Sequence, residues 1–143
     1  MSTHVFTYGS LMFAPVWQRV VRGTYRSAAA TLPQHRRFAL ADDTYPGMVP
    51  EPDAEVAGVV YFDVAPADLQ ALDHFEGEEY RRISVPVRLV PPNAGALPIT
   101  VMAETYLFEA VHRLSVLPWE PEAFALQRFL DSYCSDRLGD GPK

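Results

Sequence analysis

Cysteine is nearly absent from the chain, since Cys134 is the only one among 143 residues. An intramolecular disulfide is therefore excluded, and a cysteine-based metal site is not expected. Lysine is equally scarce, because Lys143 stands alone beside many arginines, a bias typical of a GC-rich bacterial genome. The formal net charge is −6. Nucleic acid is therefore not an expected partner, because binding it needs clustered positive charge.

Long apolar runs are missing as well. The longest one, around Val56 to Phe62, is too short to cross a bilayer. The N-terminus has no basic start followed by an apolar stretch, so no secretion signal is expected. We therefore expect a cytoplasmic protein with no membrane partner, either a monomer or a weak homodimer. Length and composition fit a single domain over residues 1–143, with a frayed tail at 138–143.

Runs rich in β-branched and aromatic residues predict about six strands, connected mostly as antiparallel neighbours. These runs are His4–Tyr8, Thr24–Leu32, His35–Ala41, Glu55–Val64, Tyr80–Val90 and Ile99–Phe108. Pro33 is expected to separate the second run from the third, and Gly58 to mark a close approach of another backbone. The segment Asp42–Asp53 is rich in Asp, Pro and Gly, which predicts a loop.

Helical spacing of apolar residues predicts two or three helices. The first, a short helix or helical turn, is expected over Phe13–Val21, and the second begins near Pro66 and stops at Gly77. A C-terminal amphipathic helix is expected from Leu126, Phe129, Leu130 and Tyr133. Strands and helices together indicate an α+β domain built on a curled sheet or small barrel.

Glu76 is the strongest candidate for a catalytic residue. In the helix from Pro66 it lies seven residues after Leu69 and four after Leu72, so it shares their apolar face. A carboxylate there is costly unless it is paired, hydrogen-bonded or lining a cavity. Burial raises the pKa of a carboxyl toward the range where a general base works. Two other interpretations stay open, in which Glu76 points into solvent from a frayed helix end or pairs with an arginine.

The second candidate is the turn Tyr8-Gly9-Ser10-Leu11 at the end of the first strand. Glycine there allows successive backbone N–H groups to form a concave anion site, to which Ser10 adds a hydroxyl. The alternative is an ordinary turn that ends a strand. The glycine spacing and the lysine of a P-loop are absent.

Other chemistry has little support in the sequence. The four histidines, at positions 4, 35, 74 and 112, are dispersed, so no metal site is expected. No serine has the context of a nucleophile elbow, and Cys134 is expected to pack in a helix. Asp73 and Glu76 are a conceivable carboxylate pair for sugar hydrolysis, although nothing else indicates a carbohydrate site. Glu78 and Glu79 are expected to be solvated loop charges.

Four segments, in this order and spacing, resemble the γ-glutamyl cyclotransferase-like (AIG2-like) family. They are Val5–Leu11 (VFTYGSL), Tyr45–Pro50 (YPGMVP), Val56–Tyr61 (VAGVVY) and Leu72–Gly77 (LDHFEG), the last followed by Tyr80 and Arg82. The resemblance implies a small, mostly antiparallel β-barrel of about five to seven strands, flanked by two or three helices, with a cavity at one end.

The resemblance also implies the roles of particular residues. Glu76 matches the family's catalytic glutamate, and Tyr8, Gly9, Ser10 and Leu11 match its substrate-holding loop, while Tyr80 and Tyr106 would line the pocket. The family's reaction releases 5-oxoproline from a γ-glutamyl compound and frees the attached amine. The nucleophile is the substrate's own α-amine, so no metal and no cofactor is expected.

Two rival interpretations remain at this stage. One is a non-catalytic module that binds a small molecule in the same cavity. The other is a related lyase or transferase that acts on a different amide. The outer wall of the pocket, where the leaving amine would sit, is expected to come from Asp42–Asp53 and from the segment around Tyr106. Neither segment has a charge pattern that identifies the amine.

Overall fold

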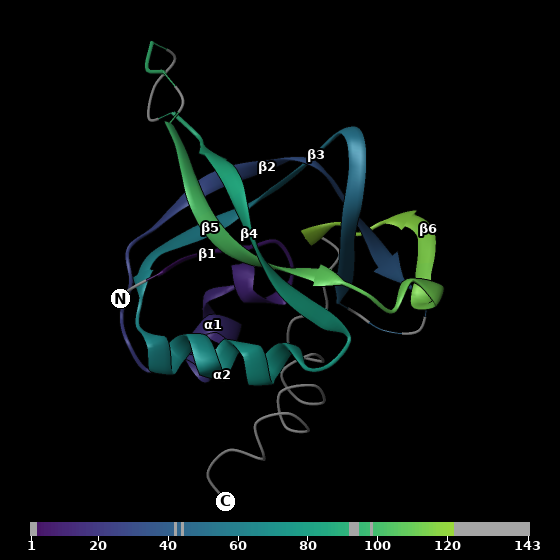
Figure 1. Cartoon of the computed structure of the whole chain (residues 1–143), viewed down its shortest axis with the longest axis horizontal. Coiled ribbons are helices and arrows are strands. Elements are labelled where there is room, and N and C mark those ends of the chain that lie inside the picture. The colour runs from purple at the N-terminus through teal and green to yellow at the C-terminus, as the bar shows by residue number, and fades with distance from the viewer. Residues whose placement is uncertain (1–2, 42, 44, 92–94, 98, 122–143) are drawn as a thin grey trace, which may run out of the picture.

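Five strands close into a mixed barrel in the computed structural model of the chain, which describes residues 3–41, 43, 45–91, 95–97 and 99–121 (Figure 1). The barrel order is β3-β1-β5-β4-β2, and β2 pairs back with β3. Only the β1–β5 pairing is parallel among the pairings of these described strands. A sixth strand, β6, extends the sheet from β2. The bounds are β1 Thr3–Thr7, β2 Ser27–Leu40, β3 Pro46–Val64, β4 Tyr80–Leu89, β5 Ile99–Phe108 and β6 Leu114–Pro118.

Two helices lie side by side across one end of the barrel (Figure 1). The first, α1, spans Ala14–Val20 and follows a short 3-10 turn, η1, at Ser10–Met12. The second, α2, spans Pro66–Glu76. Proline suits the first position of α2, and Gly77 ends the helix with a φ of 80°, a conformation that favours glycine. A second 3-10 turn, η2, covers Val111–Arg113 before β6.

The apolar core has two parts that meet at the strands. One part fills the barrel and includes Phe6, Leu32 and Val60. The other lies between the barrel and the helices, and includes Val5 and Phe75. Because successive side chains of a strand point to opposite faces, β1 places Val5 under the helices and Phe6 inside the barrel. The core thereby fixes the helices, and with them the end of α2, against the barrel.

The expected fold class is confirmed, while two local predictions are wrong. Pro33 does not divide two strands, because the β2–β3 pairing continues through it and only shifts register between Pro33 and His35. At this shift Gln34, with a φ of 65°, faces residues 51–54 of β3, so β3 carries the extra length of the bulge and β2 continues through it. The strand β6 and the turn η2 were not anticipated, since their sequence lacks a clear alternating pattern.

The segment Asp42–Asp53 is not largely loop, since β3 already begins at Pro46. Pro46 and Pro50 lie four residues apart in the paired stretch, so their missing N–H groups fall on one side of the strand, and Pro52 lies in the unpaired stretch of the register shift. The residues between them can still donate to β2, which explains how a proline-rich segment joins the sheet. The expected C-terminal helix, the tail at 138–143 and Cys134 lie outside the described residues.

A buried carboxylate joins α2 to the connection between α1 and β2. Asp68 accepts hydrogen bonds from the backbone N–H groups of Arg22 and Gly23, both at 2.9 Å, and from the Tyr25 hydroxyl at 2.6 Å. The Tyr25 hydroxyl in turn accepts the N–H of Ala65 at 3.0 Å. Burial alone would raise the pKa of Asp68, but these bonds outweigh it and hold the pKa below the ordinary 3.8.

Replacement of Asp68 by asparagine is expected to lower the free energy of unfolding by about 2 kcal/mol, since a buried charge-assisted network is lost. A carboxylate with a depressed folded-state pKa stabilises the fold fully above its unfolded-state pKa. That stabilisation is lost as the pH falls through the lower folded-state pKa. Denaturant titrations at pH 7 and near pH 3 measure this, and the difference between wild type and variant should shrink at the lower pH. An equal difference at both values would contradict the assignment.

Candidate active site

Glu76 is the last residue of α2, one position before the helix ends at Gly77. Its neighbours Leu72 and Phe75 are fully buried in the helix-side core and fix the rotation of the helix. The Glu76 side chain is half-buried and faces a cavity between the end of α2 and the barrel. The apolar face proposed from spacing thus holds Leu72, while Glu76 lies at the margin of that face.

One cavity brings together the seven residues that the sequence and the resemblance indicated. Its empty space measures about 390 Å³ including its open mouth. The lining consists of Phe6, Thr7, Tyr8, Gly9, Ser10, Leu11, Tyr45, Pro46, Phe75, Glu76, Tyr80 and Tyr106. Its walls are therefore mainly aromatic and apolar, and Glu76 contributes a carboxylate among them. Tyr45 and Pro46 come from the segment expected to form an outer wall.

The loop Tyr8–Leu11 lies across this cavity from α2, with its backbone held in place. The turn η1 is closed by hydrogen bonds from Met12 N–H to Gly9 O, at 3.0 Å, and from Phe13 N–H to Ser10 O, at 3.1 Å. Gly9 passes close to Pro46, where an added Cβ would lie 2.8 Å from the proline ring. The bonds that close η1 begin at Met12 N–H, so they do not use the N–H groups of Gly9, Ser10 and Leu11.

The three tyrosines predicted to bind substrate donate their hydroxyl protons to the protein itself. Tyr8 donates to the carbonyl of Tyr106 at 2.6 Å, Tyr80 to that of Pro46 at 2.7 Å, and Tyr106 to Asp73 at 2.7 Å. Burial, followed by the negative charge of Glu76, raises the pKa of Tyr8 well above its usual value. What these residues offer a ligand is therefore chiefly the face of a ring.

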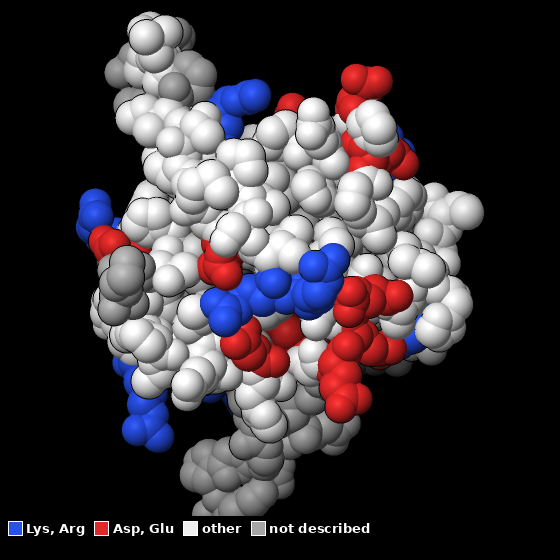
Figure 2. All heavy atoms as spheres, viewed as in Figure 1, with Lys and Arg blue, Asp and Glu red and all other residues white. Residues whose placement is uncertain are grey.

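Asp73 belongs to a polar network beside the cavity. It lines an adjoining cleft with Arg82 and Glu104, and Tyr80 and Tyr106 border both spaces. Arg82 lies 3.1 Å from Asp73 and 3.3 Å from Glu104. Figure 2 shows arginine side chains between acidic groups on the face where β4 passes α2. Asp73 thus pairs with Arg82 and Tyr106, which gives it a structural part beside Glu76.

Replacement of Tyr106 by phenylalanine keeps the ring in the cavity wall and removes only the bond to Asp73. We expect the free energy of unfolding to fall by about 1 kcal/mol, and the rate of the reaction proposed below to fall by less than about tenfold. Arg82 continues to hold Asp73, so the end of α2 should stay in place. Denaturant titration and steady-state kinetics measure the two effects. A loss as large as that for removal of Glu76 would show that the Tyr106 hydroxyl takes part in the reaction.

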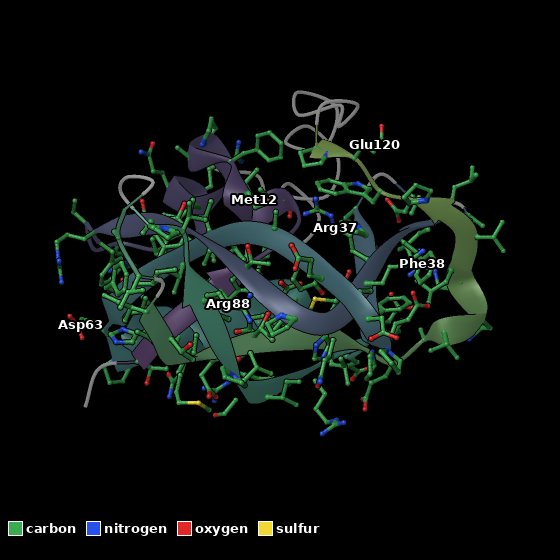
Figure 3. All side chains as sticks on the ribbon, turned by 90° about the horizontal axis from the view of Figure 1, so that it is seen from above. Met12, Arg37, Phe38, Asp63, Arg88 and Glu120 are labelled. Carbon is green, nitrogen blue, oxygen red and sulfur yellow. The ribbon has the colours of Figure 1, made fainter. Side chains whose placement is uncertain are left out.

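Arg37 was missed in the sequence, although it contacts the loop directly. It extends from β2 and donates to the carbonyl of Tyr8 at 2.6 Å and to that of Ala57 at 3.0 Å. Figure 3 shows Arg37 beside Met12, whose sulfur lies 3.7 Å from the guanidinium. The available signal was strand alternation, which places neighbouring arginines 36 and 37 on opposite faces of one strand.

Glu79 and Tyr61 do not line the cavity. Glu79 was expected to be solvated but is ion-paired with Arg113, which also lies 3.3 Å from Asp43. Tyr61 stacks on Trp17 with ring centroids 3.7 Å apart, so it belongs to the core. Within the described residues, no three His, Cys, Asp or Glu side chains gather as a metal site would require. No described helix combines the length and apolar character needed to cross a membrane.

The sequence of the chain is similar to that of known proteins. A family-wide pattern described as "Gamma-glutamyl cyclotransferase, AIG2-like" matches residues 5–122. AIG2-like protein D of Arabidopsis thaliana is 39% identical over 85 residues, which cover 59% of this chain and 56% of that protein. The chain therefore spans about half the length of the curated relatives it matches. These relatives are plant proteins, so a bacterial source stays a prediction.

Solved structures share the fold. A solution structure from Arabidopsis thaliana superposes with a TM-score of 0.68 at 26% identity, covering 95% of this chain and 82% of that one. A structure named gamma-glutamyl cyclotransferase gives a TM-score of 0.63 at 19% identity, covering 96% and 81% of the two chains. At that identity the second likeness establishes the fold alone.

Proposed function

Because the chain belongs to the γ-glutamyl cyclotransferase, AIG2-like family, we propose that it cyclises a γ-glutamyl compound to 5-oxoproline and releases the attached amine. The observation that carries the proposal is one cavity in which the Glu76 carboxylate faces the backbone of Tyr8–Leu11. The surrounding aromatic walls suit the short chain of a γ-glutamyl group. This combination supplies a proton carrier, a set of hydrogen-bond donors and a confined space.

The reaction joins two parts of one substrate. The α-amine nitrogen attacks the γ-carbonyl carbon, and a new C–N bond closes a five-membered ring. The bond from that carbon to the leaving nitrogen then breaks, so 5-oxoproline and a free amine are formed without added water. An enzyme gains most here by holding the chain in its ring-closing conformation, since such intramolecular reactions reach effective molarities of about 10⁵ M or more.

Glu76 has a defined part in this proposal. Its carboxylate takes a proton from the attacking α-amine and gives a proton to the leaving nitrogen, so one group acts as both base and acid. The nucleophile is already in the substrate, which removes the need for an enzyme nucleophile. The N–H groups of the Tyr8–Leu11 loop hold either the α-carboxylate or the oxygen on which negative charge develops.

The direct test is a panel of γ-glutamyl amino acids and γ-glutamyl amines incubated with the purified protein. We expect at least one of them to yield 5-oxoproline and its amine in equal amounts, measured by mass spectrometry, without an added cofactor. A thermal shift with 5-oxoproline but no turnover of any panel member would contradict the proposal. That outcome would favour a binding module that uses the same cavity.

A further inference from the structure

We propose that Arg37 is a positioning residue for this site, which sets the peptide plane between Tyr8 and Gly9 so that the N–H of Gly9 faces the cavity. The inference rests on the proposed function for its kinetic consequence. Its structural part concerns the orientation of one peptide group and can be tested without a substrate.

The contact that fixes the plane is short and charge-assisted. The guanidinium of Arg37 donates to the carbonyl oxygen of Tyr8 at 2.6 Å, within the usual distance for bonds from an ionised donor. The same nitrogen donates to Ala57 O on β3 at 3.0 Å, so the carbonyl of Tyr8 is tied to the barrel wall. Arg37 does not line the cavity, whereas Tyr8 and Gly9 both do.

The geometry of a peptide group transmits this contact to Gly9. No cis peptide bond occurs in the described residues, and in a trans peptide the C=O and the following N–H point in opposite directions. A Tyr8 carbonyl held toward Arg37 therefore directs the N–H of Gly9 away from Arg37. A donor aimed into this aromatic-walled cavity is a strong partner for an oxyanion or a carboxylate.

Arg37 is itself held in place from the other side. Its guanidinium carbon lies 5.2 Å from the centroid of the Trp119 ring, which is almost wholly buried. Such a cation–π contact orients the planar guanidinium. Trp119 directly follows β6. A residue from the end of the sheet therefore supports Arg37, which in turn contacts the Tyr8–Leu11 loop.

The experiment compares Arg37→Met with Arg37→Lys and with the matched control Arg36→Met. Arg36 is the preceding residue of β2, where it pairs with Glu51 at 2.6 Å. We expect kcat/KM for 5-oxoproline release to fall at least about tenfold in Arg37→Met, because a misplaced donor is costly. Arg37→Lys should recover part of the loss, and Arg36→Met should match wild type. A loss in kcat assigns the Gly9 N–H to the oxyanion, and a rise in KM assigns it to the carboxylate.

The second readout is the residual dipolar coupling of the Gly9 N–H bond in weakly aligned protein. In wild type and Arg36→Met it should fit a trans peptide whose Gly9 N–H points away from Arg37. In Arg37→Met it should depart from that value, while couplings of barrel residues such as Val60 and Val87 stay unchanged. If Arg37→Met does not fold, Arg37→Lys is compared with wild type instead, and its Gly9 coupling should depart from the wild-type value by a smaller amount.

The outcomes separate this inference from the proposed function. An unchanged Gly9 coupling in Arg37→Met overturns the inference, whatever the activity of the protein. So does a kcat/KM within twofold of wild type while removal of Glu76 abolishes turnover. If wild type releases no 5-oxoproline from any compound, the proposed function fails, and the Gly9 coupling alone decides the structural part.

Discussion

Replacement of Glu76 by glutamine is expected to reduce the rate of 5-oxoproline release by about 10³-fold or more, while the fold is preserved. Glutamine has nearly the same shape but carries no titratable proton, and general acid–base catalysis contributes about 10²- to 10⁴-fold. The side chain is half-buried at the end of α2, where its neighbours Leu72 and Phe75 hold the helix in place. The substitution should therefore leave the packing of α2 intact.

Single-turnover and steady-state kinetics of Glu76→Gln measure this, with thermal unfolding as the check on the fold. Glu78→Gln is the matched control, since Glu78 lies two residues further on, is exposed and does not line the cavity. The control should keep full activity. Activity of Glu76→Gln within a few-fold of wild type would refute the role of Glu76 as the proton carrier.

Replacement of Gly58 by alanine is expected to destabilise the fold by about 3 kcal/mol or more, because overpacking of this kind displaces backbone. A Cβ at position 58 would lie 2.1 Å from the carbonyl oxygen of Thr7 and 2.8 Å from the ring of Phe6. The first of these atoms belongs to the backbone of β1 and cannot rotate away. The strand must therefore shift, and Thr7 immediately precedes the loop of the candidate site.

Denaturant unfolding of Gly58→Ala measures the loss, with Ala57→Ser as the control that also adds one heavy atom. Ala57 is exposed on the same strand, so its substitution should change stability by no more than about 0.5 kcal/mol. We also expect weakened activity in any Gly58→Ala protein that folds. A stability equal to that of wild type would show that β1 and β3 can separate freely at this point.

Much of the fold could be predicted from the sequence, because several segments have a clear periodic pattern of apolar residues. Ile99–Phe108 is a strand with the expected bounds, and α2 runs from Pro66 to the expected stop at Gly77. The expected close backbone approach at Gly58 is confirmed by the position of Thr7. In each of these segments local preference and tertiary packing favour the same structure.

Where the predictions failed, long-range pairing outweighed local preference. The prolines at positions 46, 50 and 52 favour a loop when only neighbouring residues are considered. The pairing with β2 tolerates them because Pro46 and Pro50 share one side of the strand and Pro52 lies in the unpaired stretch of the register shift. The register shift between Gln34 of β2 and residues 51–54 of β3 depends on pairing between the two strands, which no short window of sequence contains. Arg37 escaped notice for a similar reason, since its partner Tyr8 is 29 residues away.

The residues that line the candidate site could be predicted from the sequence, whereas most of their hydrogen bonds could not. Helical spacing singled out Glu76, and the glycine at the end of the first strand singled out the turn at Gly9. The resemblance added Tyr80 and Tyr106, and all of these residues border one cavity. Sequence patterns do not reveal that the tyrosine hydroxyls donate to backbone carbonyls and to Asp73, because those partners are distant in the chain. The catalytic and binding roles of these residues stay predictions.

The hydrogen bond from Tyr8 to the carbonyl of Tyr106 joins residues 98 positions apart. It also accompanies the parallel pairing of β1 with β5. Contacts of such long range form slowly, because the entropy of closing a large loop must be overcome first. During synthesis, the loop that ends β1 leaves the ribosome long before β5, which carries Tyr106 on the opposite wall of the cavity. The cavity is thus complete only when the barrel closes, so partly folded chains hold every residue of the site before β5 but no enclosed pocket.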